Sequence, residues 1–512
     1  MQIDTFESPA VMPRRAVVTC VVLLIAAAVA VRVYRIDTPP GDFQPARQYG
    51  LATTARAMYW LADPSTPEWK RAVAEGQMEQ AVRIEPPLTE IISARAYRLL
   101  GGERIWVPRS MGVLAWLVGG VFLWLLVRRF LPAEAVLVSV GFYGLAPFGI
   151  LMSRSLQPDA LMVMGLLASA WATYWYFEAP SAWRLVASGL VAGAAVFLKP
   201  GASQFAVIGM FAALSIHREG ARWTLADARV WLFAFLALAP AFVYYVLQMT
   251  EAVPLRDVLS GHFIPSLLGT VYFWRAWAGN LVDVLGLAVL AIGAIGVLLL
   301  PAGLPRSLAG GLAAGYVVQC LFDSLATAIQ PSVHVHAIPL AALGLGALSV
   351  PVWDVLGRAV PRRALGVLAP LVLVAWFGLS LRGAAWLAAE YTGGDLPTIA
   401  AEIGEAVNHS TRTVFLDYND GKPTCYFGLY AGRSWPETAD QEFEGRFRIP
   451  AYTAEERFRI LYAPDNPDFF IVSRNFQDLD RQPDLKHFLQ KHFRELTRTP
   501  RYLIYDLKKP AK

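Results

Sequence analysis

"AVVTCVVLLIAAAVAV", residues 16–31, contains no charged side chain. A helix of about 20 mainly apolar residues is long enough to span the hydrocarbon core of a bilayer. Arg14 and Arg15 precede this run, and "RVYRIDTPP" continues directly after it without a small-residue cleavage site. We therefore expect a retained signal-anchor span and not a cleaved signal peptide.

The composition of the whole chain agrees with a membrane protein. The 512 residues are 55% hydrophobic and 17% charged, whereas soluble domains carry roughly 25% charged residues. The net charge of +5 is explained by arginines in loops that set membrane topology, and not by nucleic-acid binding. Cys20, Cys320 and Cys425 are far apart in the sequence, so neither a disulfide framework nor a CxxC metal site is expected.

Apolar runs predict a mostly α, polytopic membrane protein with about eleven transmembrane helices. Their centres lie near residues 25, 116, 142, 168, 191, 208, 239, 290, 316, 345 and 373. Arginines fall on alternate loops, namely Arg14/Arg15, Arg128/Arg129, Arg184, Arg218/Arg222, Arg306 and Arg358/Arg362/Arg363. The positive-inside rule places these loops and the N-terminus in the cytoplasm.

The opposite loops should face the periplasm or the cell exterior. The first, about residues 34–105, is the longest of the membrane part. The second, about 249–280, contains "SGHFIPSLLGTVYFWRAWAGN", whose aromatic residues are typical of an interfacial helix. An odd number of spans also places the C-terminus outside.

The composition becomes polar near residue 395, which predicts a transmembrane domain over 1–394 and an exterior domain over 395–512. In the latter, "LPTIAAEIGEAV", "AEERFRILYA" and "LKHFLQKHF" have helical patterns, whereas "TVFLDY", "FFIVS" and "YLIYDL" resemble strands. Their alternation predicts a small α/β domain.

Charged groups at a membrane boundary are costly and usually face a cavity. Five stretches bring such groups to the predicted outer side. They supply Asp42 and Arg47; Arg83, Glu85 and Glu90; Arg154 and Asp159; Lys199; and His334 and His336.

Each group also has an ordinary structural explanation. Asp42 alone is equally compatible with a solvated loop residue. Glu85 and Asp159 are suited to helix N-termini, and Lys199 is suited to snorkelling toward the interface. Two histidines spaced two apart share a face only in an extended segment, so a loop pair without a ligand role is the simpler explanation. The location of separate acids on one predicted side favours a site.

The same stretches resemble a known superfamily. They are "PPGDFQPARQYGLATTARAMYW", "RIEPPLTEIISARAYRLLGGERIWVPRSMGVLAW", "SRSLQPDALMVM" and "ASGLVAGAAVFLKPG". In order and spacing they resemble the polyprenyl-phosphate-dependent glycosyltransferases of the GT-C superfamily. The resemblance is closer to protein-mannosyltransferase-like (glycosyltransferase family 39-like) and aminoarabinose-transferase-like bacterial enzymes, and it covers about residues 15–215. "YFGLYAGRSW" is weakly similar to a segment of some members' exterior domains.

The resemblance implies a GT-C-type helix bundle and transfer of a sugar from a polyprenyl-phosphate-linked donor, with inversion, to a lipid, glycan or protein acceptor. The expected location is the exterior face of the cytoplasmic (inner) membrane. Asp42 matches the catalytic acid of the first loop, Glu85 lies in the block near the donor phosphate or a divalent metal, and Asp159 matches a further acid. Departures are Phe43 where a second acid is common, Glu85 where some relatives have lysine, and no tyrosine pair near His334.

The residue types agree with this chemistry on physical grounds. Sugar transfer needs a base for the acceptor hydroxyl and cations for the phosphate leaving group. The cations available are Arg47, Arg83, Arg154 and Lys199, and the histidines are further candidates for binding substrate. Two alternatives remain open, a transporter or flippase of lipid-linked sugars and a non-catalytic assembly protein of envelope glycans. Transporters usually place polar groups in the middle of broken spans, whereas here the charges lie at span ends.

Overall fold

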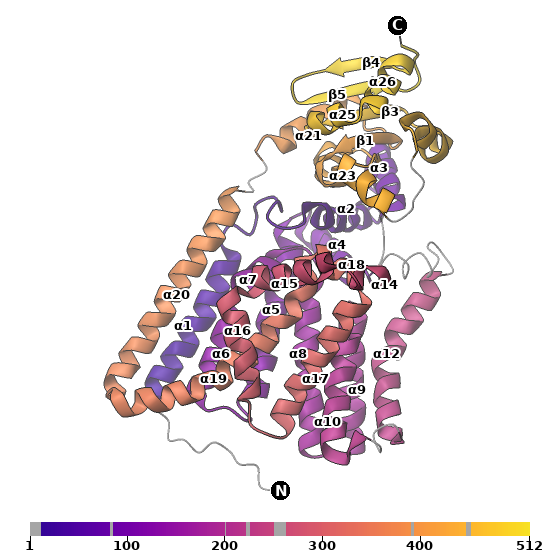
Figure 1. The fold of residues 1–512 in the computed structure, drawn as a ribbon. Helices are drawn as coiled ribbons and strands as arrows, with labels where there is room; N and C mark the ends of the chain where they lie inside the picture. Colours follow the sequence, from indigo (N-terminus) through magenta and orange to yellow (C-terminus); the bar gives the residue numbers. More distant parts are fainter. Residues whose placement is uncertain are drawn as a thin grey trace. The chain divides into compact units, whose positions relative to one another are not determined.

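The computed structural model describes residues 12–81, 85–199, 201–221, 226–249, 263–390, 394–446 and 452–511. Of these residues, 75% are helical, and the chain divides into two compact units (Figure 1). The first unit comprises residues 1–36 and 109–387, and the second comprises 37–108 and 388–512. The first exterior loop therefore groups with the C-terminal region. The division into a transmembrane domain over 1–394 and an exterior domain over 395–512 stays a prediction.

The first unit is a helix bundle. Its long helices are α1 (Arg14–Val33), α5 (Trp106–Val127), α6 (Ala133–Leu145), α7 (Pro147–Arg154), α8 (Asp159–Glu178), α9 (Ala182–Leu198), α10 (Gln204–Glu219), α12 (Ala228–Met249), α15 (Val271–Leu285), α16 (Leu287–Leu298), α17 (Leu304–Phe322), α19 (Ala337–Ala359) and α20 (Arg362–Glu390). Short elements are α14 (Pro265–Leu268), α18 (Ser324–Ile329) and the 3-10 helix η1 (Pro331–His336).

All eleven predicted span centres lie inside helices of this unit. Within the described ranges, six helices are long and apolar enough to cross a membrane, and the number rises to eight if two bent pairs are single spans. The bent pairs are α6–α7 and α15–α16, and α9 is a shorter apolar helix. The prediction of a multi-helix membrane domain is confirmed, whereas α10 and α17 do not meet the length and hydropathy test.

The two bends have local causes. Pro147 begins α7 and lacks the N–H that a continuous helix would use, and α6 and α7 meet at 51°. Gly286 has φ 78° between α15 and α16, which meet at 91°. Only glycine adopts that backbone conformation without strain. The aromatic segment of the second exterior loop is therefore helical, as predicted, and turns sharply into the next span.

Glycines allow two helix pairs to pack with their backbones in contact. A Cβ on Gly315 of α17 would lie 2.2 Å from the Phe205 carbonyl oxygen of α10. A Cβ on Gly296 of α16 would lie 2.0 Å from the Gly344 carbonyl oxygen of α19. Small residues at such crossings are the usual means of helix association in membranes.

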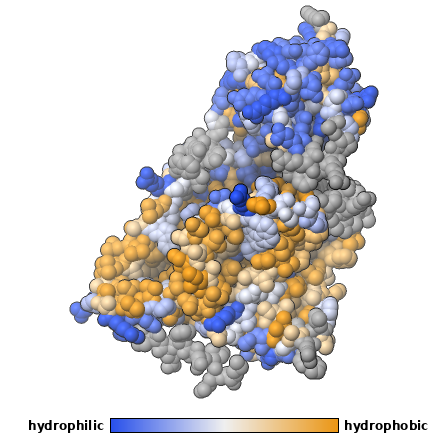
Figure 2. Space-filling view, viewed as in Figure 1, coloured by the Kyte–Doolittle hydropathy of each residue, from blue (hydrophilic) through white to orange (hydrophobic). Residues whose placement is uncertain are grey.

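Helix α8 runs between two polar ends of the bundle. At its C-terminal end, Glu178 pairs with Arg129, Arg184 donates to the Ala179 carbonyl, and Arg218 donates to the Phe177 carbonyl. Asp159 lies at the other end, and 20 residues of helix are about 30 Å long, close to the thickness of a bilayer core. Apolar side chains dominate the surface between these ends in Figure 2. The arginine loops that flank α8 are thus gathered on one side.

The second unit contains three helices from the first exterior loop, α2 (Pro45–Leu61), α3 (Glu68–Glu79) and α4 (Leu88–Leu100). Its C-terminal part contains α21 (Leu396–Ala406), β1 (Thr413–Asp417), η2 (Tyr418–Gly421), α22 (Lys422–Gly428), β2 (Gly432–Ser434), α23 (Thr438–Arg446), α24 (Ala454–Arg457), η3 (Phe458–Tyr462), η4 (Ala463–Asp465), β3 (Phe469–Ser473), α25 (Phe476–Arg481), α26 (Pro483–His492), β4 (Arg494–Arg498) and β5 (Tyr502–Asp506).

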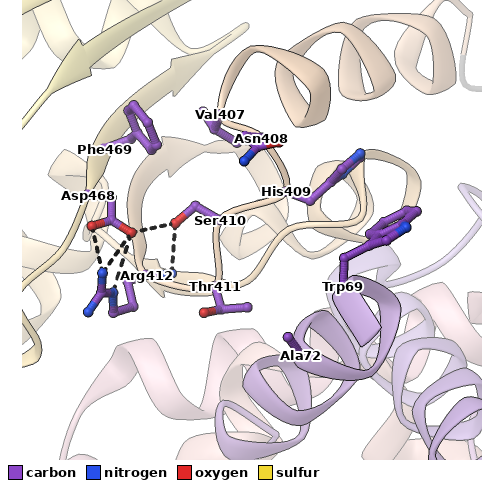
Figure 3. Close-up of a pocket in the computed structure, with 10 residues that line it drawn as sticks. All are labelled: Trp69, Ala72, Val407, Asn408, His409, Ser410, Thr411, Arg412, Asp468 and Phe469. Carbon is purple, nitrogen blue, oxygen red and sulfur yellow. Dashed lines mark hydrogen bonds and ion pairs between the residues drawn. The ribbon is translucent and has the colours of Figure 1, made fainter. Parts of the chain in front are cut away.

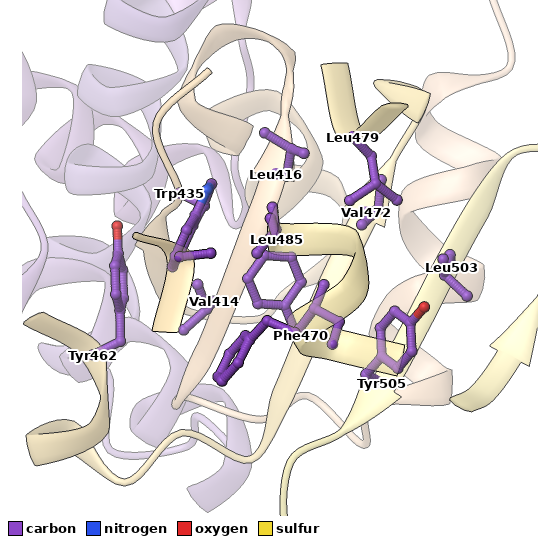
Figure 4. Close-up of a cluster of buried hydrophobic side chains, with 13 residues drawn as sticks. Val414, Leu416, Trp435, Tyr462, Phe470, Val472, Leu479, Leu485, Leu503 and Tyr505 are labelled. Atoms are coloured by element: carbon purple, nitrogen blue, oxygen red, sulfur yellow. The ribbon is translucent and has the colours of Figure 1, made fainter. Parts of the chain in front are cut away.

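The strands form one mixed sheet in the order β2-β1-β3-β5-β4. Strands β1, β2 and β3 are parallel, with Asp417 opposite Ser473, whereas β5 is antiparallel to both β3 and β4. Helices cover both faces. One core contains Trp435, Phe470 and Leu485 with residues of α24–η3, α25 and α26 (Figure 4). The other packs Ile399 and Ile403 of α21 against the opposite face. The predicted α/β domain is confirmed, and β2 and β4 are additional strands.

Candidate functional site

Asp159 and Lys199 form an ion pair at the end of the bundle where α8 begins. The Lys199 Nζ atom lies 2.6 Å from Asp159 Oδ1, and the Asp159 side chain is completely buried. Asp159 begins α8 after Pro158, and Lys199 follows the last residue of α9. A buried carboxylate is costly without a partner, and the Lys199 ammonium supplies one.

His336 belongs to the same cluster. It is 2% exposed, its Nδ1 lies 3.0 Å from the Val333 carbonyl oxygen, and it is within electrostatic range of Lys199 and Asp159. The structure differs from the expected loop, because η1 is a 3-10 helix that buries both histidines. Their lack of a ligand role stays a prediction.

His334 is held in a chain of hydrogen bonds. The Trp277 Nε1 donates to the Tyr316 hydroxyl at 3.0 Å, and that hydroxyl lies 2.7 Å from His334 Nδ1. His334 Nε2 lies 3.0 Å from the Thr327 carbonyl oxygen. Since a carbonyl only accepts, Nε2 carries hydrogen and Nδ1 accepts from Tyr316. The structure thus brings a tyrosine to this histidine although the local sequence has none.

Arg154 caps α1. Its Nη1 donates to the carbonyl oxygens of Val31, Arg32 and Tyr34 at 3.1, 3.2 and 2.6 Å. These are the acceptors that a helix C-terminus leaves unpaired. The side chain is 4% exposed, which fits a role in fixing the end of α1.

Sequence reasoning missed a set of buried polar atoms at this end of the bundle. Gln157, two residues before Asp159, is 2% exposed, and neither its Oε1 nor its Nε2 has a hydrogen-bond partner among the described residues. The same holds for Ser332 Oγ and Arg32 Nη2. A buried amide with both atoms unpaired is costly. Such atoms are suited to a polar ligand, and the motif "SLQPDA" was the available signal.

In the second unit, Asp42 precedes α2. The Gln48 Nε2 donates to Asp42 Oδ1 at 3.1 Å and also to the Phe43 carbonyl oxygen. Gln48 is fully buried, so it holds the partly exposed carboxylate of Asp42 in a fixed orientation near the start of α2. A helix N-terminus also stabilises a carboxylate.

Arg47 and Glu85 are brought together in the same unit. The Arg47 Nη2 donates to Glu85 Oε1, and Pro86 and Pro87 connect Glu85 to α4. Glu85, just before the proline pair, therefore pairs with the first turn of α2. Arg83 lies outside the described residues.

The described residues do not offer a metal centre. They contain no group of three or more His, Cys, Asp and Glu side chains placed to hold a metal ion. Glu85, the candidate ligand, is paired with an arginine instead. The described side chains therefore do not fit a divalent metal at Glu85.

The predicted residues thus form two clusters, one in each unit. Asp159, Lys199, His334 and His336 gather at one end of the first unit, and Asp42, Arg47 and Glu85 lie around the start of α2 in the second. The first cluster offers a cation beside the unpaired amide of Gln157, and the second offers two carboxylates and a cation. This is the equipment for binding a phosphate and polar hydroxyl groups.

Part of the chain matches a known protein family. Residues 85–246 match the family described as dolichyl-phosphate-mannose-protein mannosyltransferase. No curated protein sequence matches the chain.

Solved structures match nearly the whole chain. ArnT from Cupriavidus metallidurans, bound to undecaprenyl phosphate, has a TM-score of 0.54 and 15% identity, over 95% of this chain and 97% of that one. Its apo form has a TM-score of 0.55 and 15% identity, over 96% and 98%. The Archaeoglobus fulgidus oligosaccharyltransferase tethered to an acceptor peptide has a TM-score of 0.51 and 11% identity, over 97% and 74%. The predicted resemblance is thereby confirmed as a similarity: the fold is shared with these two transferases over nearly the whole chain, and residues 85–246 match the mannosyltransferase family.

Proposed function

We propose that this protein is a membrane glycosyltransferase that moves a sugar from a polyprenyl-phosphate-linked donor to an acceptor on the exterior face of the cytoplasmic membrane. The observation that carries the proposal is the buried Asp159–Lys199 pair beside the unpaired amide of Gln157. Charged groups and an unpaired buried amide at the end of an apolar helix bundle suit a ligand with a lipid tail and a polar head. The fold shared with ArnT, which binds undecaprenyl phosphate, supports the same donor class.

In the proposed reaction, Lys199 binds the phosphate of the donor. Asp159 holds Lys199. As the bond between the anomeric carbon and the phosphate oxygen breaks, the Lys199 ammonium stabilises the charge that develops on the leaving group. The products are the glycosylated acceptor and polyprenyl phosphate.

Asp42 is the proposed general base. Its carboxylate takes the proton of the acceptor hydroxyl while the acceptor oxygen attacks the anomeric carbon opposite the phosphate, which inverts the anomeric configuration. Gln48 orients this carboxylate through the bond to Oδ1. A base positioned in this way contributes about 10²–10⁴-fold to the rate.

The test uses the purified full-length protein and a radiolabelled undecaprenyl-phosphate-linked sugar. The parent should release undecaprenyl phosphate, and Lys199→Met should bind it at least about tenfold more weakly because a phosphate contact is lost. Lys486→Met, which removes an exposed lysine of α26, is the matched control. Movement of an intact donor across vesicles without release of undecaprenyl phosphate would instead support a flippase.

A further inference from the structure

A groove of about 870 Å³ opens in the second unit at the amino ends of β1 and β3 (Figure 3). Its volume lies within the range of roughly 300–1,000 Å³ that is typical of small-molecule sites. Helix α3, the segment between α21 and β1, and the start of β3 line it. The lining residues are Trp69, Ala72, Val407–Arg412, Asp468 and Phe469.

One wall is aromatic. The Trp69 indole is stacked on the His409 imidazole, with ring centroids 4.4 Å apart and an angle of 22°, and 42% of Trp69 is exposed. His409 Nδ1 lies 3.2 and 3.0 Å from the carbonyl oxygens of Gly428 and Leu429, so Nδ1 carries hydrogen and the ring is fixed. The stack presents a rigid, flat apolar edge to the groove.

The other wall is polar and planar. The Arg412 guanidinium donates to both oxygens of Asp468 at 3.0 and 3.3 Å, and Ser410 Oγ donates to the same carboxylate at 2.9 Å. Figure 3 shows this group across the groove from Trp69 and His409, with Asn408 between them. Arginine, carboxylate and amide groups bond adjacent hydroxyls in pairs, because each has two polar atoms in one plane.

The charge balance argues against an anionic ligand. Arg412 and Lys508 both lie within ion-pair distance of Asp468, and Glu405 lies 3.5 Å from His409 Nε2. Lys70 Nζ lies 5.4 Å from the Trp69 centroid. An anion would compete with Asp468 for Arg412, whereas a neutral ligand would use both partners.

We propose that this groove binds a neutral saccharide, with the apolar C–H face of a sugar ring against the Trp69–His409 stack and its hydroxyls on Asn408, Arg412 and Asp468. Saccharide binding by the groove does not depend on the proposed function. Its biological role does, because we take the saccharide to be a glycan acceptor or product recognised outside the reacting centre. The groove itself contains none of the candidate catalytic residues.

The test measures saturation-transfer NMR of three linear tetrasaccharides, of glucose, mannose and galactose, with the full-length protein in nanodiscs. At least one should bind. Trp69→Ala should weaken binding about tenfold, since an aromatic contact contributes up to about that factor, and Trp69→Phe should restore part of it. Tyr418→Ala removes an aromatic side chain that is 41% exposed in the same unit and should bind like the parent.

Three results would overturn the proposal. These are binding of none of the tetrasaccharides, equal binding by Trp69→Ala and the parent, or displacement of the saccharide by millimolar inorganic phosphate. Asp42→Asn separates this proposal from the catalytic one, because it should lose transfer and keep saccharide binding. If transfer fails in every assay while the groove binds, only the proposed function is wrong.

Discussion

At the scale of single residues, Gln157 distinguishes a binding site from a structural cluster. A buried amide that serves only packing should cost stability, because neither of its polar atoms is paired within the described residues. Because Gln157 lies two residues from Asp159, we infer that a ligand supplies the missing partners.

We predict that Gln157→Leu raises stability and lowers activity together. Replacing an unpaired amide with an apolar group of similar size should leave the melting temperature unchanged or raise it. Loss of two ligand contacts should lower kcat/KM about tenfold or more. The variant is measured by thermal denaturation and by donor turnover. Unchanged turnover with unchanged donor binding would assign Gln157 to packing alone.

Asp417 gives the C-terminal α/β domain a specific pH dependence. It is 1% exposed at the end of β1, and burial raises its pKa to about 6, although the Arg474 guanidinium and the Thr424 hydroxyl oppose the shift. The folded state therefore binds a proton more tightly than the unfolded state, whose aspartate pKa is about 3.9. The stabilisation is complete below that value and is lost as pH rises through about 6.

We predict that the domain is less stable at pH 7.5 than at pH 5, by about 1.4 kcal/mol. Hydrogen exchange of the β1 and β3 amides in the full-length protein, corrected for intrinsic rates, measures this change. Asp417→Asn should remove most of the dependence, because it mimics the protonated form. Protection of the parent strands that is flat across this range would contradict the assignment.

At the scale of elements, the segment predicted as the first exterior loop contacts the C-terminal region through α2 and α22. Arg56 of α2 is 3% exposed and donates to the Tyr426 carbonyl oxygen at 2.7 Å and to Gln77 Oε1 at 3.1 Å. Gln77 in turn donates to the carbonyl oxygens of Cys425 and Tyr430. The Arg56 guanidinium also lies 4.2 Å from the Tyr426 ring centroid. These contacts fix the helix whose first turn carries Arg47 and Gln48.

We predict that Arg56→Met loosens α2. It leaves two buried acceptors unpaired, at a cost of about 2 to 4 kcal/mol, so the α2 amides should exchange at least about tenfold faster. Transfer activity should fall although Arg56 touches no proposed substrate group. Arg71→Met of α3, which loses bonds only to the Thr66 and Asp63 carbonyls, is the control. Equal exchange in both variants would show that Arg56 does not hold α2.

The sequence predicts those elements whose own residues carry a clear hydrophobic pattern. Long apolar runs and the buried strands β1, β3 and β5 have strong patterns, and the structure confirms them. Strand β2 has three residues, and β4 is exposed and charged, so neither has a hydrophobic pattern to detect. Helices α2 and α3 are stabilised partly by contacts with α22, which is more than 300 residues away in sequence.

The candidate site was predictable in its charges and not in its pairings. Asp159, Lys199 and Asp42 stand out because charge is rare at span ends. Their partners depend on tertiary structure, since Lys199 is 40 residues from Asp159 and Arg47 is 38 from Glu85. Neutral residues such as Gln157 carry no such signal.

At the scale of the whole molecule, the arginine end of the bundle predicts orientation. We expect the C-terminal domain to lie outside the cytoplasm, because cytoplasmic loops carry the arginines. The three native cysteines are buried, so an added exposed cysteine should report alone. In cells with a permeable outer membrane, an impermeant maleimide should label Lys491→Cys, and it should label Arg363→Cys only after lysis of the inner membrane. The reverse pattern would contradict the orientation.

The central claim is that Asp42 removes a proton during sugar transfer from a polyprenyl-phosphate donor. Asp42→Asn keeps an oxygen to accept from Gln48 and removes the charge that makes the carboxylate a base. With saturating donor, turnover should fall about 10²-fold or more, while undecaprenyl phosphate binding stays within about twofold of the parent. If Asp42→Asn turns over nearly as fast as the parent, and Arg47→Ala is the more damaging change, Asp42 orders the loop and the account of catalysis is wrong.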